Sequence, residues 1–179
     1  MVQPDAASIP PKLLKIRRLE PHDAVSYRAL RLEGLENHPE AFSASWEDES
    51  ARPAAWWAER LQTSTVFGGW IDESPLLGVA GFHVNSTAKL RHKGILWGMY
   101  VRPQARGSGL AAALVQRVIA HGQTLVEEIC VTVVASNAAA CRLYSAAGFE
   151  QYGLERRALK VGDEYYDELL MALPRPGRG

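Results

Sequence analysis

The sequence carries no excess of charge of either sign: 20 Lys and Arg residues balance 20 Asp and Glu residues in a chain of 179. Nucleic-acid-binding domains usually show a strong basic excess, so this balance argues against a general polyanion binder. The chain also has no apolar run of about 18 residues, the length that a membrane-spanning helix needs. Its opening segment, MVQPDAASIPP, lacks the apolar stretch of a secretory signal. We therefore expect no membrane span, no export signal and no nucleic-acid partner.

Cysteine is equally scarce. Cys130 and Cys141 are the only two, both lie in apolar surroundings, and no CxxC spacing links them. Two buried free thiols are typical of a reducing compartment, where structural disulfides are rare. We expect a cytoplasmic protein that binds no metal.

The remaining composition and patterning predict one α/β domain. Apolar residues make up 47% of the chain, which is enough for a sizeable core. We place this domain at residues 13–173, between an N-terminal arm (1–12) and a C-terminal tail (174–179). Periodicity and turn residues predict strands over 13–19, 65–71, 76–84, 94–101, 129–135, 149–159 and 165–173, and helices over 24–36, 54–62, 109–121 and 137–147. Asp23 is the expected N-cap of the first helix, and residues 40–52 are expected to be irregular.

The most informative stretch is WGMYVRPQARGSGLAA at residues 97–112. An apolar strand ends at Arg102-Pro103, a glycine-bearing turn follows, and a helix begins near Gly109. Unpaired N–H groups and the helix dipole make such a helix start suitable for a phosphate, and glycine lets the backbone approach it closely. The spacing is neither that of a Walker-type loop nor the three-glycine dinucleotide fingerprint. An ordinary strand-to-helix turn with two glycines remains the alternative.

A second segment, CVTVVASNAAACRLYSAAGF at residues 130–149, strengthens this interpretation. Together the two segments resemble the GNAT superfamily of acyl-CoA N-acyltransferases. Its pyrophosphate loop, Q/R-x-x-G-x-G/A, matches Arg106, Gly109 and Ala111. Its last core strand and following helix match Asn137, Tyr144, Gly148 and Phe149.

The resemblance implies a single-domain GNAT-like fold, with a mixed, mostly antiparallel sheet flanked by helices in the order βααβββαβαββ. It also implies acetyl-CoA as co-substrate and transfer of the acetyl group directly to an amine. The residues that it implies for coenzyme binding are Met99, Tyr100, Val101, Arg106, Gly107, Ser108, Gly109, Leu110, Ala111, Ala112 and Asn137. Tyr144 is the implied general acid near the sulfur. Asn137 could equally serve only as a helix N-cap, and Tyr144 only as a core residue.

The general base and the acceptor stay open. The two strands on which relatives carry a base have no carboxylate at the corresponding positions here. The remaining candidates are Glu33, Glu47, Asp48, Glu49, His83 or a water chain. Residues 46–49 fall where the family shapes its acceptor site, so their carboxylates could attract an amine or simply be solvated. The acceptor could be a small molecule or a peptide or protein amine, and a homodimer is compatible with the resemblance. A catalytically silent acyl-CoA-binding module is the alternative function.

Overall fold

The computed structural model describes residues 13–174, so the expected arm over residues 1–12 and residues 175–179 of the expected tail lie outside the described residues. The chain forms one seven-stranded sheet in the order β1-β2-β3-β4-β5-β7-β6. Neighbouring strands are antiparallel except β4 and β5, which run parallel. The strands are β1 (Leu14–Arg18), β2 (Thr65–Ile71), β3 (Gly78–Val84), β4 (Lys93–Val101), β5 (Glu128–Val134), β6 (Glu150–Val161) and β7 (Glu164–Pro174). Pro174, expected in the tail, closes β7.

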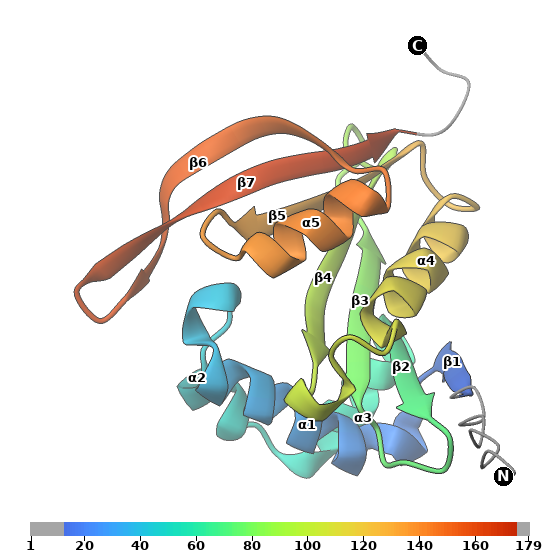
Figure 1. Ribbon diagram of the computed structural model, residues 1–179. Helices are drawn as coiled ribbons and strands as arrows, with labels where there is room; N and C mark the ends of the chain where they lie inside the picture. Colours follow the sequence, from blue (N-terminus) through green and yellow to red (C-terminus); the bar gives the residue numbers. More distant parts are fainter. Residues whose placement is uncertain (1–12, 175–179) are drawn as a thin grey trace, which may run out of the picture.

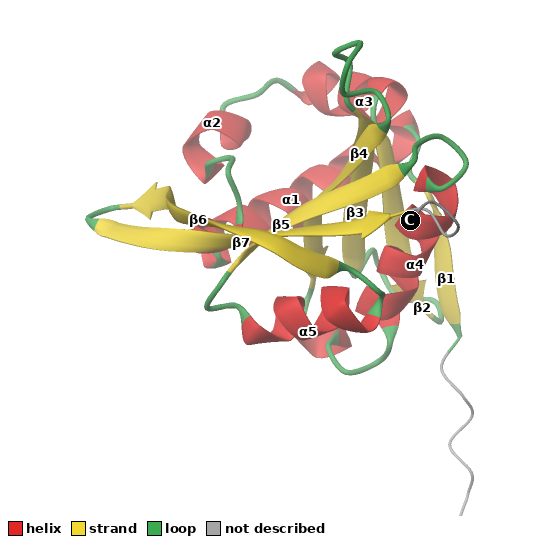
Figure 2. Cartoon of the chain, turned by 90° about the horizontal axis from the view of Figure 1, so that it is seen from above, coloured by secondary structure: helices red, strands yellow, loops and turns green. Residues whose placement is uncertain are grey.

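Helices cover both faces of the sheet (Figures 1 and 2). One face carries α1 (Ala24–Asn37), α2 (Trp46–Ser50) and α3 (Ala54–Thr63), and the other carries α4 (Leu110–Gly122) and α5 (Ala138–Ala146). Three short 3-10 turns, η1 (Pro21–Asp23), η2 (Pro39–Ala41) and η3 (Pro103–Ala105), connect these elements. Each face has its own buried apolar cluster, and both clusters pack on the sheet. Within residues 13–174, no helix is both long enough and apolar enough to cross a lipid bilayer.

The α/β fold predicted from the sequence is confirmed, with one added helix and one corrected cap. The segment expected to be irregular contains α2, because Ser45 caps its N-terminus by accepting a hydrogen bond from Asp48 N at 3.1 Å. Asp23 does not cap α1. Its carboxylate instead accepts from Glu20 N at 2.9 Å and pairs with Arg17 at 2.7 Å, which closes the turn before the helix.

A β-bulge in the middle of β4 shapes the region around the site. Val79 pairs with Tyr100 and Gly81 with Trp97, so two residues of β4 oppose one residue of β3. Gly98 takes a φ of 63° at this point, a conformation that glycine adopts without steric cost. β4 pairs with β5 only from Lys93 to Ile95. Beyond the bulge the two strands therefore leave backbone groups unpaired along an opening in the sheet.

Candidate active site

A cleft of about 500 Å³ lies at this opening between β4 and β5. Its walls come from the C-terminal half of β4, the loop before α4, the first turn of α4, the end of β5, α5 and the η2 segment. The lining residues are His38, Glu40, Ala41, Phe42, Met99, Tyr100, Val101, Arg106, Gly107, Ala111, Val134, Ser136, Asn137, Ala139, Ala140 and Leu143. Segments that are distant in sequence thus meet around one concave site, the usual form of a ligand pocket.

The loop that enters α4 has the geometry of an anion site. Gly107 and Gly109 have φ values of 77° and 88°, and a Cβ built on Gly107 would meet no atom within 4 Å. No hydrogen-bond partner within residues 13–174 satisfies the backbone N–H groups of Gly107, Gly109, Ala111 and Ala112. These free donors and the open space beside Gly107 fit the pyrophosphate of a coenzyme A thioester.

Two polar side chains of the same loop form hydrogen bonds to the protein's own backbone. Ser108 Oγ donates to Ala105 O at 2.6 Å and accepts from Leu110 N at 3.3 Å, so it braces the turn. Arg106 Nε donates to Val101 O at 3.2 Å, which ties the loop to the end of β4. Arg106 Nη2 lies 3.2 Å from His38 Nε2. Because a guanidinium can only donate, this contact assigns His38 Nε2 as the acceptor.

Asn137 lines the cleft and also caps α5. Its Oδ1 accepts a hydrogen bond from Ala140 N at 3.1 Å, so the two interpretations of this residue are compatible. Tyr144 lies two turns further along the helix, is only 4% exposed, and packs edge-on against Phe149 at 5.8 Å between ring centres. Burial raises the pKa of the Tyr144 phenol, which therefore keeps its proton at neutral pH.

Some of the predicted site residues line the cleft, and the others lie behind its walls. Met99, Tyr100, Val101, Arg106, Gly107, Ala111 and Asn137 line the cleft. Ser108, Gly109, Leu110, Ala112 and Tyr144 are not among the lining side chains, and Leu110 is fully buried in the core. Sequence reasoning missed the η2 segment, which brings His38, Glu40 and Phe42 to the cleft. It also missed Ala140, which lies one helical turn after Asn137, and Leu143, which lies one helical turn after Ala140.

The five candidate bases lie in different environments. Glu33 accepts hydrogen bonds from Tyr100 Oη at 3.1 Å and Arg102 Nε at 2.9 Å, and Glu49 is buried between two arginines. Asp48 accepts from Ser45 Oγ at 2.8 Å. His83 lies elsewhere, in a pocket beside α3, where burial lowers its pKa.

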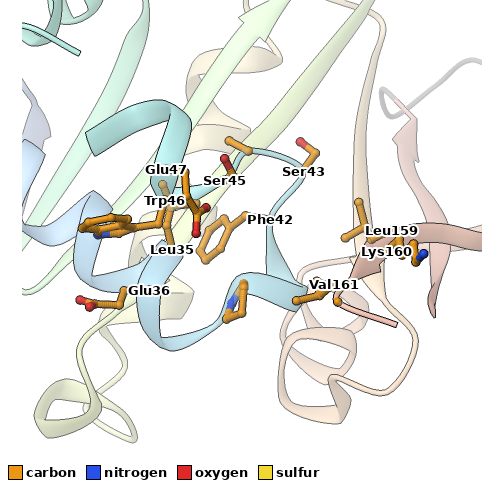
Figure 3. A pocket seen from close by; sticks show the side chains of 13 residues that line it. Leu35, Glu36, Phe42, Ser43, Ser45, Trp46, Glu47, Leu159, Lys160 and Val161 are labelled. Atoms are coloured by element: carbon orange, nitrogen blue, oxygen red, sulfur yellow. The ribbon is translucent and has the colours of Figure 1, made fainter. Parts of the chain in front are cut away.

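Glu47, the fifth candidate, lines a second pocket of about 560 Å³ that adjoins the cleft (Figure 3). This pocket lies between the α1–α2 region and the end of the β6–β7 hairpin. Its lining residues are Leu35, Glu36, Pro39, Phe42, Ser43, Ala44, Ser45, Trp46, Glu47, Leu159, Lys160, Val161 and Gly162. Phe42 lines both the pocket and the cleft, so the two cavities meet at this side chain.

The splayed β4–β5 pair, the glycine loop at a helix N-terminus and the seven-stranded sheet define the class of the protein, which is the acyl-CoA N-acyltransferase superfamily. Residues 32–149, more than half of the chain, match the acetyltransferase (GNAT) family, and the chain belongs to this family. Family membership indicates acetyl transfer as the general activity. Residues 13–174 contain no group of three or more His, Cys, Asp or Glu side chains placed to hold a metal ion.

Solved structures share this fold at low sequence identity. A GNAT-family acetyltransferase from Streptococcus pneumoniae aligns with a TM-score of 0.78 and 22% identity, over 90% of this chain and 99% of that one. The structure of yncA from Salmonella typhimurium with its cofactor acetyl-CoA aligns with a TM-score of 0.76 and 20% identity, over 93% and 96%. The ribosomal-protein-alanine N-acetyltransferase of Brucella melitensis aligns with a TM-score of 0.74 and 22% identity, over 89% and 99%.

Proposed function

We propose that this protein transfers the acetyl group of acetyl-CoA directly to an amine, within a ternary complex and without a covalent enzyme intermediate. The observation that carries the proposal is the set of free N–H groups at Gly107, Gly109, Ala111 and Ala112, placed at one end of the opening between β4 and β5. The pyrophosphate would bind these donors. The pantetheine arm would lie along Met99, Tyr100 and Val101, and the neighbour crystallised with acetyl-CoA supports this choice of co-substrate.

In this mechanism the amine nitrogen attacks the thioester carbonyl, a C–N bond forms, and the C–S bond breaks. Aligning the two reactants accounts for much of the acceleration, because the thioester is already activated. The acceptor enters as an ammonium, since a lysine-like amine has a pKa of roughly 10.4, so one proton must leave through a water or a carboxylate. The departing thiolate takes its proton from Tyr144, which we retain as the general acid. The second proton, which the nitrogen loses as the amide forms, returns to the Tyr144 phenolate through solvent.

Three further assignments belong to this proposal. The acetyltransferase domain spans residues 13–173. The protein acts in the cytoplasm, which its two free cysteines, Cys130 and Cys141, support. The acceptor is an amine carried on a small molecule, a peptide or a protein.

The experiment that tests the function is release of free thiol from acetyl-CoA in the presence of a panel of amines, with the acetylated product identified by mass spectrometry. We expect thiol release that depends on both the amine and the protein. The product should be about 42 Da heavier than the amine, because an acetyl group replaces one hydrogen when the C–N bond forms. Tight binding of acetyl-CoA without transfer to any amine would instead support the silent acyl-CoA-binding module.

A further inference from the structure

We propose that His38 is a positioning residue of the coenzyme site: its imidazole holds the Arg106 guanidinium beside the glycine loop, where the free N–H bonds of Arg106 bind the pyrophosphate of acetyl-CoA. This inference rests on the coenzyme site of the proposed function. It assigns a role in coenzyme binding to a residue that lies 68 positions before Arg106 and belongs to a different element of the cleft wall.

The backbone of His38 is fixed where α1 ends. Pro39 follows His38, and a residue before a proline is disfavoured in the helical conformation, so the chain leaves the helix at this point. His38 N donates to Gly34 O at 3.0 Å, and His38 O accepts from Ala41 N at 3.0 Å. Because both backbone groups are hydrogen-bonded, the side chain enters the cleft from a well-defined position.

Contacts around the His38 ring define its orientation. Nε2 lies 3.2 Å from Arg106 Nη2 and accepts its hydrogen bond, so the imidazole carries its proton on Nδ1. Nδ1 lies 3.7 Å from Glu40 Oε1, and the nearby carboxylate favours the proton on that nitrogen. The centre of the Tyr100 ring is 6.1 Å from the centre of the imidazole. The ring therefore presents its acceptor nitrogen to Arg106.

Arg106 is held at two of its three nitrogens. Nε donates to Val101 O at 3.2 Å, and Nη2 donates to His38. The three other N–H bonds of the guanidinium have no partner within residues 13–174. Gly107, the next residue, contributes one of the free backbone donors of the loop. A guanidinium fixed in this way offers its remaining donors to a phosphate at the same loop, a group that arginine binds well.

His38 also separates the two charged side chains of the cleft. Among the described residues that line it, Arg106 is the only cation and Glu40 the only carboxylate. The imidazole lies between them, with one ring nitrogen toward each. Opposite charges in one cleft attract each other, so without His38 the guanidinium would turn toward Glu40 and its charge would be neutralised. His38 therefore keeps the positive charge of Arg106 available to the pyrophosphate.

The test measures the Kd for acetyl-CoA by calorimetry in the full-length protein. His38→Ala should raise this Kd about threefold to tenfold, the factor expected for loss of one hydrogen bond. His38→Gln should stay within about twofold of the wild type, because its Oε1 is as many bonds from Cα as the imidazole Nε2 and also accepts. His38→Asn, one bond shorter, should lose as much affinity as His38→Ala. His92→Ala, at an exposed histidine outside the cleft, is the control and should leave the Kd unchanged.

Two further measurements show whether His38 acts through Arg106 and the phosphate. S-acetylpantetheine carries the thioester and the pantetheine arm but no phosphate. Its Kd, measured by competition with acetyl-CoA, should be the same for the wild type and His38→Ala. In an Arg106→Gln protein, His38→Ala should have no additional effect on the Kd for acetyl-CoA, because both substitutions remove the same contact.

The comparison of His38→Gln with His38→Asn decides the matter even where His38→Ala does not fold. The inference is overturned if these two variants have the same Kd for acetyl-CoA, if S-acetylpantetheine loses as much affinity as acetyl-CoA, or if the effects of His38→Ala and Arg106→Gln add. The expected Kd values without transfer to any amine would remove the proposed function and leave the inference standing. A protein that binds no acetyl-CoA would remove both.

Discussion

The guanidinium of Arg31 on α1 donates two hydrogen bonds to the carboxylate of Glu49 on α2, at 2.9 Å and 3.0 Å. The two side chains are only 5% and 7% exposed. Arg60 of α3 approaches the same carboxylate at 3.3 Å, so one buried glutamate connects all three helices on this face of the sheet. The position of α2, which carries Trp46 and Glu47, depends on this connection.

Removing the Glu49 carboxylate should therefore destabilise the fold. Glu49→Gln leaves two arginine charges facing each other in a buried site, and breaking a buried ion pair typically costs about 3–5 kcal/mol of unfolding free energy. Urea denaturation followed by circular dichroism measures this loss. Glu59→Gln, on the exposed side of α3, is the control and should stay within about 0.5 kcal/mol of the wild type. A Glu49→Gln protein as stable as this control would show that the ion pair does not hold the helices together.

The anion site can be tested at Gly109. This residue has a φ of 88°, which a β-branched side chain adopts only with strain, and it precedes the first turn of α4, so Gly109→Val should distort the turn that presents the free N–H groups to the phosphate. We expect the Kd for acetyl-CoA, measured by calorimetry, to rise at least about tenfold in a protein that still folds.

Gly162 provides the matched control for backbone strain. It has a φ of 59° in the β6–β7 turn, away from the coenzyme cleft. Gly162→Val should leave the affinity for acetyl-CoA unchanged. Equal affinities for the wild type and the Gly109→Val protein would remove this loop from the coenzyme site.

A third prediction concerns Glu168, which lies opposite Glu155 across the β6–β7 pair. Burial, together with the neighbouring Glu155 charge, raises the pKa of the Glu168 carboxyl. The folded protein therefore binds this proton more tightly than the unfolded chain, where a glutamate has a pKa of about 4.3. The contribution of Glu168 to stability falls as the pH rises from the unfolded-state pKa through the folded-state pKa.

Glu168→Gln should consequently raise the stability at pH 7, by about 0.2–1 kcal/mol, the usual size of a cross-strand charge interaction. It should also flatten the dependence of the melting temperature on pH just above pH 4.3, the ordinary value for this group. Thermal denaturation across this pH range measures both effects. A destabilised Glu168→Gln protein at pH 7 would mean that the carboxylate makes a favourable interaction in the folded state.

The sequence predicts well those features that are local in the chain. The strand, the glycine turn and the helix around Gly107 are contiguous, so their geometry follows from the order of the residues. Asn137 caps α5 as expected, because capping depends only on the next three residues. The α/β class follows from the periodicity of segments long enough to show it.

Features that depend on tertiary packing could not be predicted in the same way. The η2 segment reaches the cleft only because α1 ends at Asn37 and the chain turns back over β4, whereas Pro39 indicates only that a helix stops. Glu47 and Glu49 lie in a five-residue helix that is too short to show a hydrophobic period, so the sequence does not indicate which of the two side chains is buried. Gly98 interrupts the apolar strand pattern and could have indicated the bulge in β4, since an isolated glycine within a strand often marks one.

The last prediction concerns Tyr144 as the general acid. The phenol shares a helix face with Asn137, which lines the cleft, and its pKa is raised by burial, so it is protonated when the thiolate departs. A phenol with a raised pKa is a weak acid, and a thiolate leaves readily because a thiol has a pKa near 8.5. The rate gain from protonation by Tyr144 should therefore lie at the lower end of the roughly 10²–10⁴-fold range for general acids. We expect Tyr144→Phe to lower kcat at least about tenfold with little change in the Kd for acetyl-CoA, because the ring still packs against Phe149. Tyr27→Phe, equally buried on α1, is the control for removing a phenol from the core and should retain the wild-type kcat. Wild-type kcat in the Tyr144→Phe enzyme, under conditions where chemistry limits the rate, would make Tyr144 a packing residue and assign protonation of the thiolate to water.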